Sequence, residues 1–89
     1  MTQKTVTVYS TPTCHFCHMA KDFFTAHNIA FTDHNVGSDL EQRKLMIEKS
    51  GQMGVPVIVV ADAANQSAPE DIIIGFDEEH LRSLLGISS

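Results

Sequence analysis

Four consecutive residues, Val57-Ile58-Val59-Val60, are all β-branched and apolar. A run of this kind, without polar alternation, is typical of a strand that is buried on both faces. Such a strand lies inside a sheet and needs further layers on both sides to exclude water. The chain is therefore expected to form a layered structure with residues 57–60 near its centre.

The first third of the chain predicts a strand followed by a helix. Thr5 to Tyr9 alternates polar and β-branched residues and stops at the turn-forming segment 10–13. From Cys14 to His27 the apolar positions change to helical spacing, and Asn28 suits a left-handed helix end. The residues expected to share one face of this helix are Phe16, Ala20, Phe23, Phe24 and His27.

A second strand and a second helix are expected next. Ala30 to Val36 predicts the strand, and Gly37 ends it. The sequence Ser38-Asp39-Leu40-Glu41 matches a capping box, in which Ser38 and Glu41 satisfy the first free amides of a helix. This helix should run to about Ser50 and end at Gly51. The residues expected along one line of it are Leu40, Lys44, Ile47 and Gly51, with Met46 beside them.

The last part of the chain predicts a hairpin and a final helix. Residues 62–71 are rich in small and polar types and lead to a second β-branched run, Ile72 to Ile74. Asp77 can cap a helix that ends at Gly86, with Leu81, Leu84 and Leu85 towards the sheet. The expected fold is α/β with the order β-α-β-α-β-β-α, a four-stranded mixed sheet with three helices in one domain over residues 1–89.

Composition and charge narrow the class of partners. The chain has 89 residues, of which 43% are hydrophobic, and this suffices for one core without metal or disulfide staples. The net charge of −5 comes entirely from residues 62–89, and no basic patch is present, which argues against nucleic acid and anionic membrane as partners. No apolar run approaches the roughly 18 residues of a membrane span. We expect a monomeric, cytoplasmic protein.

The two cysteines, Cys14 and Cys17, are separated by two residues at the expected start of a helix. Free backbone amides and the positive end of the helix dipole favour a thiolate there, so Cys14 is expected to be reactive near neutral pH. Cys17 lies one turn further in and is close enough to attack a mixed disulfide on Cys14. The pair is therefore predicted to cycle between dithiol and disulfide through two exchange steps.

Val55 and Pro56 precede the predicted central strand and follow the segment Gly51-Gln52-Met53-Gly54. A cis bond between them would turn the chain sharply and leave the Val55 backbone exposed. Exposed strand-edge groups can pair with the backbone of a peptide-like substrate that lies across the thiol. Spacing alone does not fix the isomer of this bond.

Three motifs in this order resemble the glutaredoxin family, in particular the small single-domain glutaredoxin-like proteins of bacteria and archaea. They are Val6-Thr7-Val8-Tyr9-Ser10-Thr11-Pro12-Thr13-Cys14-His15-Phe16-Cys17, Gly54-Val55-Pro56-Val57, and Gly75-Phe76-Asp77 ahead of the last helix. The resemblance covers about residues 5–86. It implies the thioredoxin fold and a groove for glutathione or a protein thiol.

The resemblance also implies roles for individual residues. By position, Cys14 corresponds to the nucleophile, Cys17 to the resolving thiol and Val55 to the backbone ligand of the substrate. Pro56 corresponds to the cis proline, and Gly75 with Asp77 to the site that holds a γ-glutamyl group. The implied activity is reduction of protein disulfides or glutathione mixed disulfides. Glutathione or a dithiol protein would supply the electrons, the latter with a thioredoxin-reductase-type donor, and no cofactor is expected to be tightly bound.

Several positions depart from the pattern of that family. His15 replaces the usual proline after the first cysteine, and when protonated it should favour the Cys14 thiolate. Thr11, in the substrate groove, stands where a lysine is common, and Met53 stands where an arginine is frequent. Two cations that would meet the carboxylates of glutathione are therefore missing, and we expect only weak dependence on glutathione.

Two alternatives use the same cysteines without redox turnover. His15 and His18 flank Cys17, so the thiols and imidazoles are candidate ligands of a zinc or copper carrier. A first helical turn cannot point all four of these side chains at one ion, and the element order also argues against a metal-trafficking module. The family resemblance suggests the second alternative, an iron-sulfur cluster bridging a dimer through Cys14 and glutathione.

Overall fold

The computed structural model describes residues 4–62 and 70–86. In chain order the elements are β1 (Lys4–Ser10), α1 (His15–Ala26), β2 (Thr32–Asn35), α2 (Leu40–Ser50), β3 (Val57–Asp62), β4 (Asp71–Ile74) and α3 (Glu78–Leu85). This confirms the predicted order. The long loop predicted between the last two strands falls on residues 63–69, which lie outside the described part. No helix of that part is long and apolar enough to cross a membrane.

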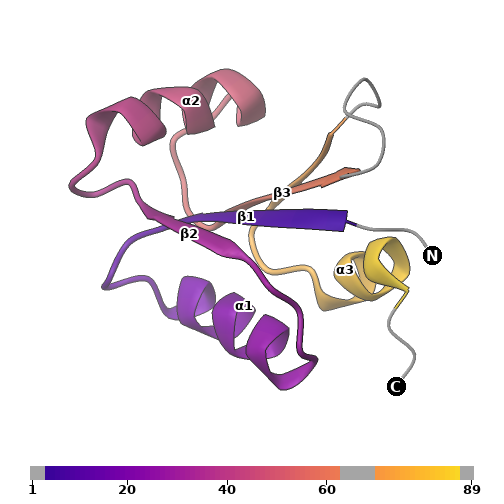
Figure 1. Cartoon of the computed structure of the whole chain (residues 1–89). Helices are drawn as coiled ribbons and strands as arrows, with labels where there is room; N and C mark the ends of the chain where they lie inside the picture. The colour runs from indigo at the N-terminus through magenta and orange to yellow at the C-terminus, as the bar shows by residue number, and fades with distance from the viewer. Residues whose placement is uncertain (1–3, 63–69, 87–89) are drawn as a thin grey trace.

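The four strands form one sheet in the order β2-β1-β3-β4. β1 is parallel to β2 and antiparallel to β3, and β3 is antiparallel to β4. Figure 1 shows α2 on one side of this sheet and α1 and α3 on the other. The sheet is therefore the middle of three layers, as the β-branched run at 57–60 predicted.

The central strand β3 supplies both cores. Val57 and Val59 pack on the α2 side, whereas Ile58 and Val60 pack on the side of α1 and α3. All four are at most 3% exposed. The α1/α3 core consists of Val6, Val8, Ala20, Phe23, Phe24, Ile58, Val60, Ile73 and Leu81, and the α2 core of Tyr9, Val36, Met46, Val57 and Val59. The strand buried on both faces is confirmed.

The buried face of α1 differs from the predicted one at its first turn. Phe16 is 57% exposed, whereas Cys17 is fully buried together with Ala20 and Phe24. These buried positions are spaced by three and four residues, so they form one stripe towards the sheet, and Phe16 lies to the side of it. The prediction that Phe16 faces the core was wrong, and the thiol of Cys17 takes that place instead.

The start of α2 also corrects the sequence interpretation. Asp39, and not Ser38, caps the helix, because its Oδ1 accepts a hydrogen bond from the Gln42 amide at 3.2 Å. The Ser38 hydroxyl instead donates to the carbonyl of Asn35 in the preceding turn. A carboxylate at this position also interacts favourably with the positive end of the helix dipole.

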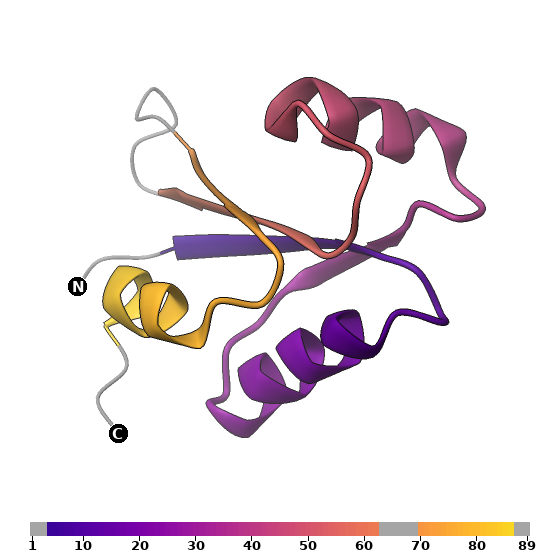
Figure 2. The ribbon, with the colours of Figure 1, turned by 180° about the vertical axis from the view of Figure 1, so that it is seen from behind.

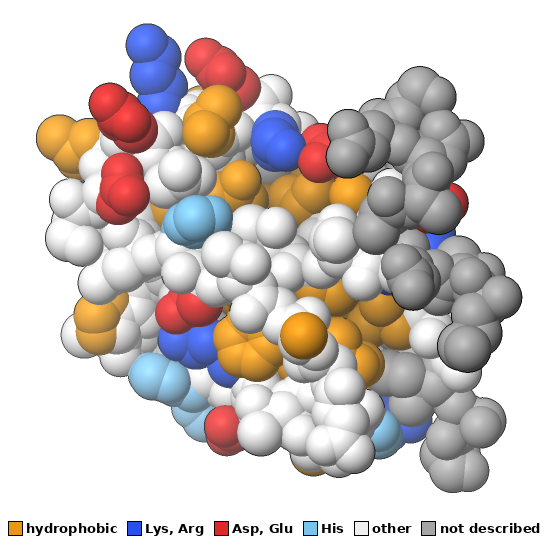
Figure 3. All heavy atoms as spheres, viewed as in Figure 1, with side chains coloured by type: hydrophobic (Ala, Val, Ile, Leu, Met, Phe, Trp, Pro, Cys, Tyr) orange, Lys and Arg blue, Asp and Glu red, His pale blue; other side chains and the backbone are white. Residues whose placement is uncertain are grey.

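α2 packs through a narrower stripe than expected. Met46 is fully buried and Ile47 packs beside it, whereas Leu40 at the helix start is 70% exposed. Charged side chains lie on the outer surface of α2 together with exposed hydrophobic ones, at the top of Figure 3. The predicted line of Leu40, Lys44, Ile47 and Gly51 is therefore not the face that packs on the sheet. Leu40, Lys44 and Gly51 are exposed, and α2 meets the sheet through Met46 and Ile47.

Candidate active site

The three sequence motifs meet at one end of the sheet. Tyr9 near the end of β1 is opposite Val57 at the start of β3, and Val57 is opposite Ile74 at the end of β4. Figure 2 shows the loop from α2 entering β3 beside the end of β1. Three segments therefore lie at this same end of the sheet. The segment after β1 carries Cys14, the segment before β3 carries Pro56, and the segment after β4 carries Gly75.

Cys14 is the N-cap residue of α1. Its Sγ accepts a hydrogen bond from the backbone amide of Cys17 at 3.2 Å, and its own amide donates to the carbonyl of Thr11 at 3.3 Å. The thiol is partly exposed, and the first turn of α1 carries no acidic residue. A backbone amide aimed at sulfur, at the positive end of a helix, stabilises negative charge on that sulfur. The predicted position of Cys14 is thus confirmed.

Cys17 has the opposite environment, because its side chain is fully buried beneath the first turn. Burial, followed by the hydrogen bond with Cys14, raises the pKa of the Cys17 thiol from its ordinary 9.0 to about 12. At neutral pH Cys17 is therefore a neutral thiol. The two sulfurs differ in access and in hydrogen bonding, since Cys14 is partly exposed and accepts a backbone amide whereas Cys17 is buried. This is the asymmetry that a two-step exchange requires.

This asymmetry predicts a loss of stability in alkali. The unfolded chain releases the Cys17 proton near pH 9, whereas the folded dithiol holds it to about pH 12. The folded state binds more protons in this window, so its free energy of unfolding falls as the pH rises, by at most about 1.4 kcal/mol per pH unit. Denaturant unfolding at several pH values should show this slope in the reduced protein. The Cys17→Ala variant should lack it, and equal slopes would contradict the buried neutral thiol.

The Val55–Pro56 peptide bond is cis, as the family resemblance implied. Pro56 is buried, and its carbonyl accepts a hydrogen bond from the Gly75 amide at 2.9 Å. Val55 is half-buried. Within residues 4–62 and 70–86, neither its backbone N–H nor its carbonyl takes part in a backbone hydrogen bond of a turn or loop. The free backbone of Val55 is the feature that a peptide-like ligand could pair with.

Gly75 and Asp77 follow β4 at the same edge. Gly75 has a φ of +84°, a conformation that residues with a side chain rarely adopt. The Asp77 carboxylate caps α3 by accepting from the His80 amide at 3.2 Å. The predicted cap is confirmed, and one carboxylate oxygen of Asp77 is already committed to holding the helix.

The positions without the expected cations also lie near this edge. Thr11 is half-buried directly after β1, and its carbonyl holds the turn that leads to Cys14. Met53 lies before the cis peptide and is 59% exposed. Neither residue can form an ion pair with a carboxylate.

His15 is the first residue of α1, and its exposed ring lies edge-on to Phe16 at 5.6 Å between centroids. It adjoins Cys14 in sequence, so positive charge on its ring would favour attack by the Cys14 sulfur. We expect His15→Ala to slow the reaction of Cys14 with the uncharged reagent iodoacetamide by about two- to threefold. The alkylation rate in the Cys17→Ser background measures this. His27→Ala, at the far end of α1, is the control, and an unchanged rate in His15→Ala would remove His15 from the chemistry.

The ring of His18 forms a hydrogen bond with the turn that precedes α1. Its Nε2 donates to the carbonyl of Pro12 at 2.8 Å and so braces the turn before Cys14. Within residues 4–62 and 70–86, no three His, Cys, Asp or Glu side chains come together in a way that could hold a metal ion.

One cluster near the thiols was not predicted. Lys21, one turn after Cys17 on α1, forms an ion pair with Asp33 of β2, with 3.2 Å between Nζ and Oδ2. The buried hydroxyl of Ser10 donates to the other oxygen of Asp33 at 2.5 Å. The spacing of Cys17 and Lys21 is visible in the sequence. Nothing local indicates Asp33, because the pair joins elements that meet only in the fold.

Comparisons with known proteins agree with this architecture. The glutaredoxin family model matches residues 6–63. A glutaredoxin-like 8.6 kDa protein in the rubredoxin operon of Clostridium pasteurianum is 36% identical over 80 residues, which are 90% of this chain and 96% of that protein. Glutaredoxin 3 of Escherichia coli K12 is 30% identical over 67 residues, or 75% of this chain and 80% of that protein.

Comparison with solved structures finds a similar fold. The crystal structure of a thioredoxin-like protein matches with a TM-score of 0.75 and 24% identity, over 89% of this chain and 97% of that one. The family model covers more than half of the chain, and the Clostridium relative covers nearly all of it. The chain therefore belongs to the glutaredoxin family and has a thioredoxin-like fold.

Proposed function

We propose that this protein is a cytoplasmic dithiol oxidoreductase that reduces protein disulfides or glutathione mixed disulfides through Cys14 and Cys17. The observation that carries the proposal is the contrast between the two sulfurs. Cys14 is partly exposed with an amide aimed at its Sγ, and Cys17 is buried one turn away as a neutral thiol. Membership of the glutaredoxin family supports the same chemistry.

The reaction proceeds in two exchanges. The Cys14 thiolate attacks one sulfur of a substrate disulfide, so that a Cys14–substrate disulfide forms and the other sulfur leaves as a thiolate that takes up a proton. Cys17 then loses its proton and attacks Cys14 Sγ, which releases the second substrate thiol. The substrate gains two electrons and two protons, and the protein is left with a Cys14–Cys17 disulfide.

The groups around the thiols would orient the substrate. The free backbone of Val55 beside Pro56 supports pairing with an extended substrate segment. Gly75 and Asp77 would hold a γ-glutamyl group, as the family resemblance implies. Thr11 and Met53 offer no charge to the carboxylates of glutathione. The proposed enzyme therefore accepts electrons from a dithiol donor at least as well as from glutathione.

Coupled reduction tests this proposal. The oxidised protein is mixed with a disulfide substrate, and NADPH consumption is followed with glutathione plus glutathione reductase, or with thioredoxin plus thioredoxin reductase. We expect consumption in both systems, and turnover with thioredoxin at least equal to that with glutathione. Protein whose thiols have been alkylated is the control. Rates no higher than this control in both systems would contradict an oxidoreductase function.

A further inference from the structure

The second exchange needs a group that makes a buried thiol ionise. Cys17 is fully buried, and its proton must leave before its sulfur can attack Cys14. Burial opposes the thiolate, so the step is slow unless positive charge lies close to Cys17. The Cys17 amide points at Cys14 and does not serve this purpose.

Lys21 supplies such a charge. It follows Cys17 by four residues on α1, and residues at this spacing are neighbours on one face of a helix, with Cβ atoms about 5–6 Å apart. Its side chain is 23% exposed, so its charge is less screened than that of a fully solvated lysine. Two influences favour the Cys17 thiolate by lowering the pKa of this thiol: a hydrogen bond with the Thr11 backbone and, more weakly, the charge of Lys21. Of these two, only Lys21 carries a charge.

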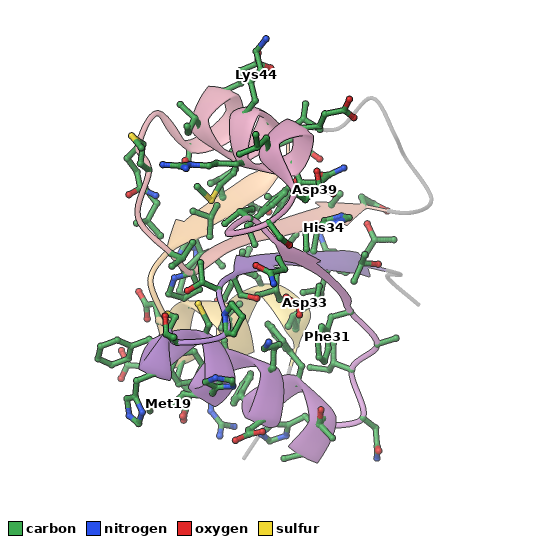
Figure 4. All side chains as sticks on the ribbon, turned by 90° about the vertical axis from the view of Figure 1, so that its left-hand side faces the viewer. Met19, Phe31, Asp33, His34, Asp39 and Lys44 are labelled. Atoms are coloured by element: carbon green, nitrogen blue, oxygen red, sulfur yellow. The ribbon has the colours of Figure 1, made fainter. Side chains whose placement is uncertain are left out.

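Two other elements keep the ammonium group in place. Asp33 of β2 accepts from Lys21 Nζ at 3.2 Å, and the buried Ser10 at the end of β1 donates to Asp33 at 2.5 Å. Figure 4 shows Asp33 on the side of the sheet that faces α1, whereas its neighbour His34 lies on the α2 side. The lysine is thereby tied to the sheet and cannot swing freely into solvent.

We propose that Lys21, fixed by Asp33 and Ser10, is a positioning residue for the resolving step, in which it stabilises the thiolate that forms on Cys17. The inference rests on the dithiol mechanism proposed above. In the step itself, Cys17 gives its proton to solvent water, and the resulting thiolate forms a bond to Cys14 Sγ. The bond between Cys14 and the substrate sulfur breaks, and the released thiolate takes up a proton from water. Lys21 stays charged throughout and acts only through its field.

The expected size of the effect follows from thiol chemistry. Lys21 is the weakest of the influences on the Cys17 thiol, so removing its charge should lower the thiolate fraction by only about threefold. The remaining thiolate becomes more nucleophilic, which offsets part of that loss. Lys21→Gln should therefore slow the resolving step roughly twofold and leave the attack by Cys14 unchanged.

A single mixing experiment separates the two steps. Reduced protein is mixed with one equivalent of dithiobis(nitrobenzoate), which releases one coloured thiolate when Cys14 attacks and a second when Cys17 resolves the adduct. We expect Lys21→Gln to slow only the second phase, and Lys21→Arg to restore it. Lys44→Gln, which removes the same charge from α2, should alter neither phase.

Three outcomes overturn the inference. The first is a second phase of unchanged rate in Lys21→Gln. The second is equal slowing of both phases, which would indicate a structural defect, and the third is a second phase that Lys44→Gln slows as much as Lys21→Gln does. A different result would overturn the proposed function itself: if the unmodified protein releases only one coloured thiolate, Cys17 does not resolve the adduct.

Discussion

Replacing Cys14 by serine is expected to abolish disulfide exchange, whereas replacing Cys17 by serine should leave a protein that forms a mixed disulfide and stops there. Cys14 is the partly exposed sulfur at the helix start, and no other described thiol is accessible. Without it the first attack cannot occur, and the expected loss of activity is at least about 1000-fold. Without Cys17 the first attack still occurs, but no second thiol of the same chain can attack the mixed disulfide on Cys14.

Intact-mass measurement after brief exposure to glutathione disulfide distinguishes the two variants. The Cys17→Ser protein should carry one glutathione, and the Cys14→Ser protein should carry none. Because Cys17 is buried, Cys17→Ala serves as a second variant that leaves no new hydroxyl in the core. Equal loss of activity in both single variants, with no adduct on either, would contradict the division of roles.

Adding the two missing cations should strengthen the use of glutathione. The double change Thr11→Lys with Met53→Arg places positive charge where the family commonly has it. An exposed ion pair contributes at most about 1 kcal/mol, so two pairs correspond to roughly a ten- to thirtyfold lower KM for a glutathionylated substrate. The kcat should change little, because these groups would bind the ground state and the transition state alike.

The control adds the same charges elsewhere. Thr25→Lys with Leu45→Arg places a lysine at the far end of α1 and an arginine on α2, so it changes the net charge equally without touching the site. Steady-state kinetics on a glutathionylated peptide should show a lower KM only for the first pair. If the control improves KM as much, the effect is general steering. If neither pair does so, glutathione is recognised by other groups.

Much of the fold could be predicted because its signals are local. The continuous run at 57–60 and the changes of periodicity gave the order of elements, and Asn28 and Gly51 have the expected left-handed conformations. One error arose where two adjacent residues suit the same structural position. Ser38 and Asp39 both suit a helix cap, and only the path of the preceding turn decides between them. Phe16 and Leu40 lie in first turns, where spacing does not show which side meets the sheet.

The site was predictable to a similar degree. The spacing of Cys14 and Cys17 indicated the pair of thiols, because both lie within one helical turn. The isomer of Pro56 and the place of Gly75 came from the family resemblance, since the hydrogen bond between them forms only once β3 and β4 have paired. The group formed by Lys21, Asp33 and Ser10 was missed for the same reason. Such contacts depend on strand register, which no local pattern specifies.

The central claim is that Cys14 and Cys17 form a disulfide with each other during exchange. Reduced protein can be treated with a small excess of glutathione disulfide, quenched with acid, alkylated and weighed as the intact chain. The account predicts a chain that has lost two hydrogens, carries no glutathione, takes up no alkylating agent, and regains both reactive thiols after reduction. A stable glutathione adduct with Cys17 still free to be alkylated would contradict it.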